Sequence, residues 1–211
     1  MKRRRRLAPL SAIVLFGAAL ASADELASQY SPLAQIRPDN VAGLQVAWTH
    51  RTGEPLIPAS GGGRPPAFEA TAVYFADRLF VGTPNGKVIA LEPETGKELW
   101  AFDAAIDRTG SYGDFANRGV AVWQDSKKDA QALCARRIFY ASIDARLFAL
   151  DAVTGVACLD FGTKGQIDLK TDLRRRPEYV GEYEETSPPA VVDDLVVVGS
   201  AIADNHRADS P

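Results

Sequence analysis

Two stretches of the chain decide the fold, because they repeat each other. Residues 86–100 read GKVIALEPETGKELW and residues 145–158 read ARLFALDAVTGVAC, so that Ala-Leu and Thr-Gly pairs recur 59 residues apart. An apolar run suited to a β-strand precedes each stretch, at residues 79–83 and 138–142, and a third such run lies at residues 196–200. Repeats of this length are typical of solenoids, propellers and other arrays.

The chemistry of the repeated unit favours a β-propeller. Each copy alternates apolar β-rich runs with short polar turns, and Gly96 and Gly155 supply the positive φ that a tight turn requires. No part of residues 24–211 carries a long apolar pattern with a helical period. The sequence therefore predicts an all-β chain that forms about three antiparallel blades. Trp48 and Trp100 each end a predicted strand, and we expect their rings to fill the wedge between neighbouring blades.

The first 23 residues are predicted to direct export and to lie outside the fold. Residues 2–6 are all positively charged, and residues 7–23 form an uncharged, mostly apolar stretch that ends in Ala-Ser-Ala. This pattern is typical of a secretory signal peptide. An uncleaved membrane anchor through residues 7–23 is the alternative. We expect a periplasmic protein whose residues 24–211 form a partial propeller domain, with peripheral membrane association as a further option.

Composition excludes several classes of protein. The 211 residues are 46% hydrophobic, with 24 basic and 27 acidic residues, which excludes a disordered tail and a polybasic nucleic-acid binder. Loss of residues 1–23 would remove five positive charges and no acid, so the exported chain would be more acidic still. We expect no nucleic-acid partner, because DNA phosphates would repel such a chain.

Short motifs from about residue 30 onward follow one another in a specific order. They are Tyr30-Ser31-Pro32-Leu33, Val46-Ala47-Trp48, Arg51-Thr52-Gly53, the Ala90-Leu91 and Thr95-Gly96 pairs, Arg118-Gly119-Val120-Ala121, Cys134-Ala135-Arg136-Arg137, Thr186-Ser187-Pro188-Pro189 and Asp204-Asn205. In this order they resemble the pyrroloquinoline quinone (PQQ)-dependent dehydrogenases, in particular the quinoprotein glucose dehydrogenase branch. Members of that family are eight-bladed propellers, so the resemblance implies that this chain corresponds to about the first three blades of a truncated propeller.

The resemblance also implies a site for PQQ and Ca²⁺. Glu69, Arg118, Thr186 and Ala203 match family positions that contact the cofactor, and Asp204 and Asn205 match positions that help to hold Ca²⁺. Carboxylate and amide oxygens are the ligands that Ca²⁺ prefers. Judged from the residues alone, an arginine before a strand is usually a solvated charge, and Asp-Asn in a loop is usually an Asx turn.

One departure from the family pattern leaves the substrate class open. Alcohol-oxidising members carry adjacent cysteines where this chain has Tyr112-Gly113, and glucose dehydrogenases carry a histidine where it has Asp114. The aromatic ring of Tyr112 is a candidate to stack on the quinone in place of the cysteine pair. Either a sugar or an alcohol therefore remains a candidate substrate.

The two cysteines, Cys134 and Cys158, are 24 residues apart and are expected on neighbouring strands of one blade. Pairing is the default for cysteines in an exported protein. The alternative, a redox-active pair, lacks the C-x-x-C spacing of that chemistry. The resemblance also places a structural disulfide here.

Two functions are compatible with the sequence. The resemblance implies a PQQ-dependent oxidoreductase that oxidises glucose, another aldose or an alcohol and passes electrons to a quinone or cytochrome acceptor of the respiratory chain. The family's catalytic aspartate lies in later blades, so no catalytic residue is assigned, and we expect the chain alone neither to turn over substrate nor to bind PQQ tightly. The alternative is a non-catalytic periplasmic propeller of the outer-membrane assembly type. It would share the Thr-Gly turns, but it would have no reason to hold Arg118, Thr186 and Asp204 in register.

Overall fold

The computed structural model describes residues 33–60, 64–203 and 211. The chain divides into two compact units, Met1–Arg37 and Pro38–Pro211. Residues 33–37 of the first unit contain no strand or helix, and the predicted signal segment lies outside the described residues. Throughout the described ranges, no helix is long and apolar enough to cross a membrane. The one helix among them is a short 3₁₀ turn, η1 (Val41–Gly43).

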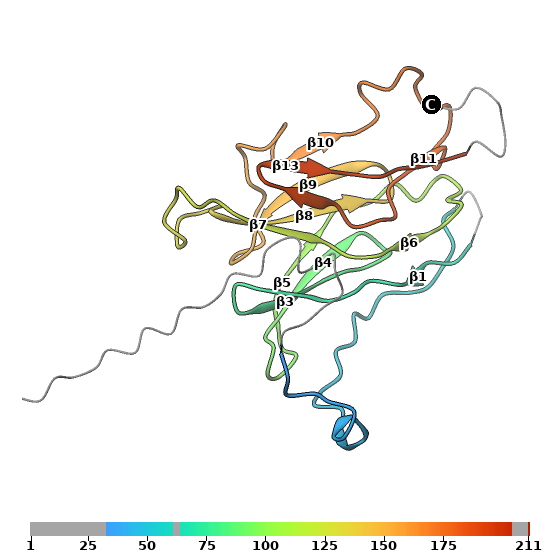
Figure 1. The fold of residues 1–211 in the computed structure, drawn as a ribbon. Helices are drawn as coiled ribbons and strands as arrows, with labels where there is room; N and C mark the ends of the chain where they lie inside the picture. Colours follow the sequence, from blue (N-terminus) through green and yellow to red (C-terminus); the bar gives the residue numbers. More distant parts are fainter. Residues whose placement is uncertain (1–32, 61–63, 204–210) are drawn as a thin grey trace, which may run out of the picture. The chain divides into compact units, whose positions relative to one another are not determined.

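Two four-stranded antiparallel sheets are the largest sheets of the second unit (Figure 1). Their strands pair in chain order, as in a propeller blade, and a two-stranded hairpin begins a third sheet. The first sheet consists of β2 (Val73–Phe75), β3 (Arg78–Gly82), β4 (Lys87–Leu91) and β5 (Glu98–Asp103), the second of β7 (Ala121–Gln124), β8 (Arg136–Ser142), β9 (Arg146–Asp151) and β10 (Gln166–Asp168), and the hairpin of β12 (Ala190–Val192) and β13 (Leu195–Val197). The predicted all-β propeller architecture is confirmed.

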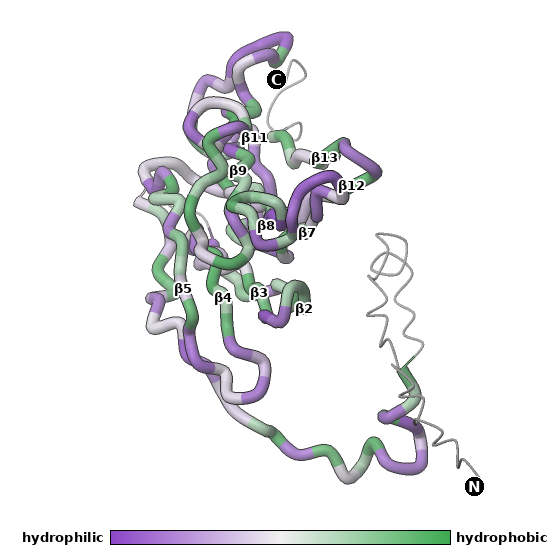
Figure 2. The backbone as a smooth tube through the Cα atoms, turned by 90° about the vertical axis from the view of Figure 1, so that its left-hand side faces the viewer, coloured by the Kyte–Doolittle hydropathy of each residue, from purple (hydrophilic) through white to green (hydrophobic). Residues whose placement is uncertain are grey.

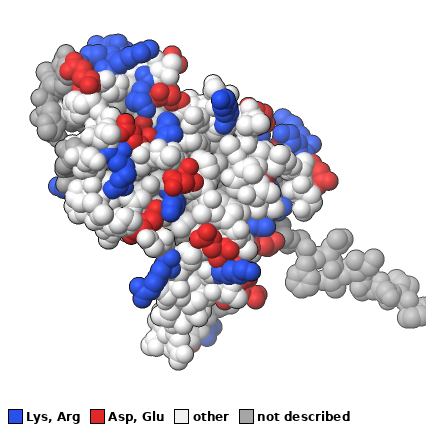
Figure 3. Space-filling model, turned by 180° about the vertical axis from the view of Figure 1, so that it is seen from behind, with Lys and Arg blue, Asp and Glu red and all other residues white. Residues whose placement is uncertain are grey.

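The core of this unit lies in the middle strands of the two blades. Phe80, Val88, Ile138 and Leu150 are fully buried in one cluster, and Figure 2 shows hydrophobic residues along β4 and β9. These strands read as nearly continuous apolar runs because both faces of each sheet are covered. Surface charge is mixed: in Figure 3, acidic and basic side chains are interspersed over the visible face.

Tryptophan rings pack against the Thr-Gly turns. The Trp100 ring, at the end of the first blade, lies against Gly155 in the second, and its indole nitrogen donates to the Ala152 carbonyl at 3.3 Å. Trp48 lies against Gly96 in the same way and donates to the Pro93 carbonyl at 2.9 Å. The expected aromatic filling between the two blades is confirmed for Trp100.

The strand expected at residues 46–48 is wrong, because residues 44–50 have no regular secondary structure. Trp48 is held by its ring and its indole N–H, both of which contact the turn of the first blade, and not by strand pairing.

Each Thr-Gly turn is closed by an acidic side chain. Asp151 accepts hydrogen bonds from the backbone N–H and the hydroxyl of Thr154, both at 2.8 Å, and from the N–H of Cys134 at 2.7 Å. Burial opposes ionisation of this carboxyl, but the hydrogen bonds outweigh it and lower its pKa. Glu92 forms the same contacts with Thr95 in the first blade. The acid and the threonine therefore fix the turn locally, as their recurrence in the sequence suggests.

Cys134 and Cys158 form a disulfide bond, with Cα atoms 5.7 Å apart. The expected placement on neighbouring strands is wrong: Cys134 lies in the turn before β8, and Cys158 follows the turn after β9. Both cysteines are buried. The bond therefore ties together two connections at one end of the second blade.

Candidate functional site

Four segments, three that precede blade strands and one that follows β13, lie side by side. β1 (Ala67–Phe68) pairs in parallel with β6 (Ala116–Asn117), and β11 (Tyr183–Glu184) pairs in antiparallel with β14 (Ala201–Ile202). A backbone hydrogen bond from the Arg118 N–H to the Thr186 carbonyl joins the two pairs. We call residues 67–71, 115–118, 183–186 and 200–203 the lead-in row. Figure 1 shows β1, β6 and β11 on the same side of the molecule.

The backbone of Arg118 links three segments of the lead-in row. Its carbonyl accepts from the N–H of Thr71 at 3.2 Å, and its own N–H donates to the carbonyl of Thr186 at 3.1 Å. The neighbouring Asn117 is buried, donates its side-chain amide to the Ala141 carbonyl, and accepts from the N–H of Gly119. Main-chain bonds and one buried amide therefore fix the position of Arg118.

The side chain of Arg118 contacts two carboxylates. Its Nη2 atom lies 2.6 Å from Oδ2 of Asp114 and 3.0 Å from Oε2 of Glu69. The hydrogen bond that Arg118 donates to Asp114 is the main cause of a raised Arg118 pKa, so the guanidinium is permanently charged. The three side chains are partly exposed and carry a net charge of one negative unit. Nε and Nη1 of Arg118 form no hydrogen bond to any described residue, and such donors are suited to a carboxylate ligand.

All four predicted cofactor residues lie in the lead-in row, and direct contacts join three of them. Glu69 and Arg118 are in direct contact, and Thr186 bonds Arg118 through its backbone. Ala203 lies in the fourth segment of the row, where its N–H donates to the Glu182 carbonyl at 3.0 Å. The predicted metal ligands Asp204 and Asn205 lie outside the described residues. Within the described ranges, no cluster of three or more His, Cys, Asp or Glu side chains could hold a metal ion.

The interpretation of Tyr112 as a stacking residue is wrong. Tyr112 is buried, its ring packs on Phe115 with centroids 5.1 Å apart, and its hydroxyl donates to the Asp107 carbonyl. Desolvation by this burial raises the pKa of its phenol. Tyr112 belongs to the core that supports the lead-in row and presents no free ring face to a ligand.

Two adjacent carboxyl groups beside Thr186, those of Glu184 and Glu185, were not predicted from the sequence. Glu184 accepts from the N–H of Gly113 at 2.6 Å and of Asp114 at 3.4 Å, and burial raises its pKa. Glu185 is fully buried, and burial raises its pKa to about 7. The signal that could have found them is the acid pair directly before the Thr-Ser-Pro-Pro motif.

The raised pKa of Glu185 predicts a specific dependence of stability on pH. Its folded-state pKa lies above its ordinary value of 4.5, so its stabilising contribution is complete below about pH 4.5 and is lost as pH rises through about 7. Between about pH 4.5 and 7, the free energy of unfolding of wild type should fall by on the order of 1–3 kcal/mol more than that of Glu185→Gln. Urea unfolding of both proteins at several pH values measures the difference. Parallel pH profiles would contradict the assignment.

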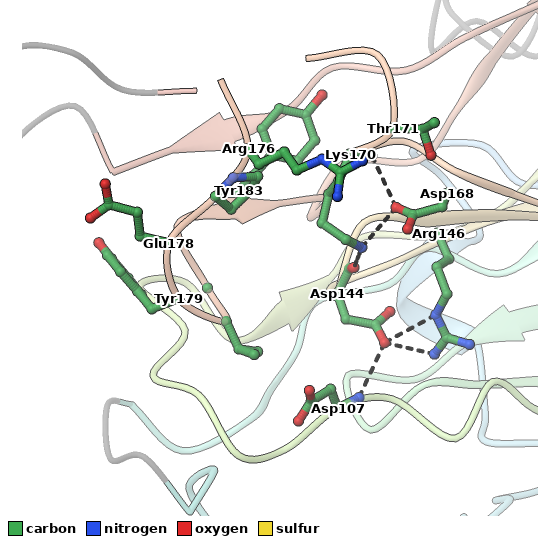
Figure 4. A pocket seen from close by; sticks show the side chains of 13 residues that line it. Asp107, Asp144, Arg146, Asp168, Lys170, Thr171, Arg176, Glu178, Tyr179 and Tyr183 are labelled. Carbon is green, nitrogen blue, oxygen red and sulfur yellow. Dashed lines mark hydrogen bonds and ion pairs between the residues drawn. The ribbon is translucent and has the colours of Figure 1, made fainter. Parts of the chain in front are cut away.

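A cavity of about 520 Å³ lies beside the lead-in row (Figure 4). Asp144 and Arg146 pair across part of its wall at 2.6 Å, and Lys170 contacts Asp168 at 3.0 Å. The cavity is lined by Asp107, by residues of the second blade and the turn that follows it, and by the 176–183 segment, including Tyr183. None of the predicted cofactor residues lines it. The cavity is therefore separate from the contacts of Arg118.

Comparisons with known proteins show which family the chain resembles. The family model for the β-propeller domain of glucose, ethanol and alcohol dehydrogenases, named PQQ, matches residues 20–211. Quinoprotein glucose dehydrogenase A of Acinetobacter calcoaceticus is 34% identical over 87% of this chain and 24% of its own length. The glycerol dehydrogenase large subunit of Gluconobacter oxydans is 32% identical over 89% of this chain and 25% of its own length. The chain thus spans about a quarter of these relatives.

A solved structure shares the fold as well. The quinohemoprotein alcohol dehydrogenase of Comamonas testosteroni superimposes with a TM-score of 0.58 and 26% identity, over 83% of this chain and 22% of the other.

Proposed function

The chain belongs to the PQQ β-propeller family of glucose, ethanol and alcohol dehydrogenases, and from this premise we propose that it serves the oxidation of a CH–OH group with PQQ as cofactor. The observation that carries the proposal is the position of Arg118, which main-chain bonds hold between Glu69, Asp114 and Thr186. When bound, PQQ would take up the two electrons of the oxidation, and Ca²⁺ would act as a Lewis acid.

The residues of the lead-in row fit such a cofactor. PQQ carries carboxylates, and the free Nε and Nη1 groups of Arg118 can each donate a hydrogen bond to a carboxylate oxygen. Glu69 and Asp114 leave this region one negative charge in excess, so a bound polycarboxylate requires a cation beside it. Asp204 and Asn205 would supply oxygen ligands for Ca²⁺.

The substrate, acceptor and location follow the same proposal. A sugar or an alcohol is the proposed substrate class, because the relatives include glucose and glycerol dehydrogenases. A quinone or cytochrome would accept the electrons, and residues 1–23 would export the protein to the periplasm as a cleaved signal or as an anchor. Since the chain spans about a quarter of its relatives, we propose that it supplies cofactor contacts but does not turn over substrate by itself.

Substitution of Arg118 tests the proposed cofactor contact. Titration of the chain with PQQ in the presence of Ca²⁺, followed by tryptophan fluorescence, should show saturable quenching. Arg118→Ala should weaken binding at least tenfold, because a hydrogen bond to a charged group contributes about 1.5–3 kcal/mol. Arg174→Ala is the matched control, since Arg174 is exposed and lies outside the lead-in row.

Equal affinities of wild type and Arg118→Ala would overturn the assignment of Arg118. Quenching that does not depend on Ca²⁺ would remove the case for a metal. Dye-linked oxidation of glucose or glycerol by the chain with PQQ and Ca²⁺ would contradict the proposal that it does not turn over substrate by itself.

A further inference from the structure

Glu185 is a fully buried acid with incomplete hydrogen bonding. Its Oε1 atom accepts from the hydroxyl of Ser200 at 2.6 Å, whereas Oε2 is buried without a hydrogen-bond partner among the described residues. A buried carboxylate with one unpaired oxygen is costly, and a neutral carboxyl is much less so. The surroundings of Glu185 therefore favour a bound proton.

The same hydroxyl connects Glu185 to the surface. Ser200 is exposed, and its Oγ atom lies 2.5 Å from the hydroxyl of Tyr183, whose side chain borders the cavity of Figure 4. Tyr183 and Glu185 lie two residues apart on an extended segment, so they point to the same face and meet Ser200 together. Each hydroxyl carries one proton and can accept another. The three groups form a continuous hydrogen-bonded chain from the buried carboxyl to the surface.

No described charge compensates Glu185. The neighbouring Glu184 is bonded to the N–H groups of Gly113 and Asp114, and Glu182 on the same segment is paired with Arg175. From the segment packed against it, residues 200–203, only the Ser200 hydroxyl reaches Glu185. No lysine or arginine of the described ranges forms an ion pair with it. Protonation is therefore governed by burial, opposed by a single hydrogen bond.

We propose that Glu185 is a reversible proton-binding residue, and that its proton exchanges with solvent through the hydroxyl groups of Ser200 and Tyr183. In uptake, the Tyr183 oxygen takes a proton from water while the Tyr183 proton moves to Ser200 and the Ser200 proton moves to Oε1 of Glu185. In release, the three transfers run in reverse. Each hydroxyl ends with one proton, and no electron is transferred.

The position of this carboxyl suits the proposed reaction. Oxidation of a CH–OH group to a carbonyl releases two electrons and two protons, and a proton acceptor is most effective when its pKa is near the working pH. Burial places the pKa of Glu185 at about 7, and Glu185 is adjacent to Thr186 in the lead-in row. This use of the proton rests on the proposed function, whereas the reversible proton binding does not depend on any cofactor.

Carbon NMR of the full chain tests the proposal without a cofactor. With glutamate labelled at the side-chain carboxyl carbon, one resonance should titrate with a midpoint near pH 7 and should disappear in Glu185→Gln. Ser200→Ala removes the hydrogen bond that favours the ionised form, so the midpoint should rise by about one pH unit. Glu94→Gln, which removes an exposed carboxyl in the first blade, should leave the resonance in place.

A Glu185 resonance that titrates near the ordinary 4.5 of glutamate would overturn the proposal. An unchanged midpoint in Ser200→Ala would overturn the path through Ser200. If Glu185→Gln does not fold, the wild-type midpoint and its shift in Ser200→Ala still decide the matter. Loss of PQQ binding with an intact titration near pH 7 would reject the proposed function alone.

Discussion

Replacement of Trp100 by alanine should lower the free energy of unfolding by about 3–5 kcal/mol, the range for removal of a large aromatic side chain from a packed site. The ring lies between the two blades, against Gly155 and 5.7 Å from the centroid of Phe80, and its indole N–H donates to Ala152. Alanine would leave a gap at this junction and would expose both blades to water. Urea unfolding followed by circular dichroism measures the change.

Leu99→Ala is the matched control, since Leu99 precedes Trp100 on β5 and is exposed. It should change the free energy of unfolding by less than about 1 kcal/mol. Gly155→Ala tests the same junction from the other side, because its Cβ would lie 2.6 Å from the Trp100 ring at a φ of +75°. The two substitutions should be strongly non-additive, because they remove one contact. A loss below about 1 kcal/mol in Trp100→Ala would refute the structural role of the ring.

Loss of the Cys134–Cys158 disulfide should cost about 3–3.5 kcal/mol. The bond closes a loop with a sequence separation of 24 residues, and the entropy of closing such a loop in the unfolded chain gives that value. A double substitution, Cys134→Ser with Cys158→Ser, should therefore unfold at a clearly lower urea concentration. Both sulfur atoms lie in the buried cluster of the second blade, so the native packing should otherwise persist.

The reducing agent dithiothreitol provides the control for this prediction. It should destabilise wild type by a similar amount and should leave the double-serine protein unchanged. If wild type has the same free energy of unfolding with and without the reductant, and reduction of the disulfide is confirmed, then the bond does not stabilise the protein by restricting the conformations of the unfolded chain.

The sequence predicted the blades because their determinants are local. The acid and threonine of each turn bond each other within three residues, and Gly96 and Gly155 adopt the positive φ that the turn needs. The prediction of a strand at Trp48 was wrong because an apolar run does not reveal whether a partner strand is present. Trp48 nevertheless meets the Gly96 turn, as its likeness to Trp100 suggests.

The candidate site was predictable only in part. The resemblance located Glu69, Arg118 and Thr186, and the structure brings them together. It could not show that Tyr112 is buried, because that depends on packing with Phe115. The role of Glu184 was hidden for a similar reason: its partner Gly113 is 71 residues away in the sequence. Contacts at that separation follow from the arrangement of blades and leave no local pattern.

In the lead-in row, backbone hydrogen bonds hold the segments in place, so the side chains that would contact a ligand do not determine the fold there. The spacing of positions 69, 118 and 186 is set by amide and carbonyl groups, which nearly all residue types possess. Side chains at these positions can therefore be exchanged while their anchor points stay fixed. For protein engineering, the row is a ready template on which a new set of three functional groups could be installed for a different guest molecule.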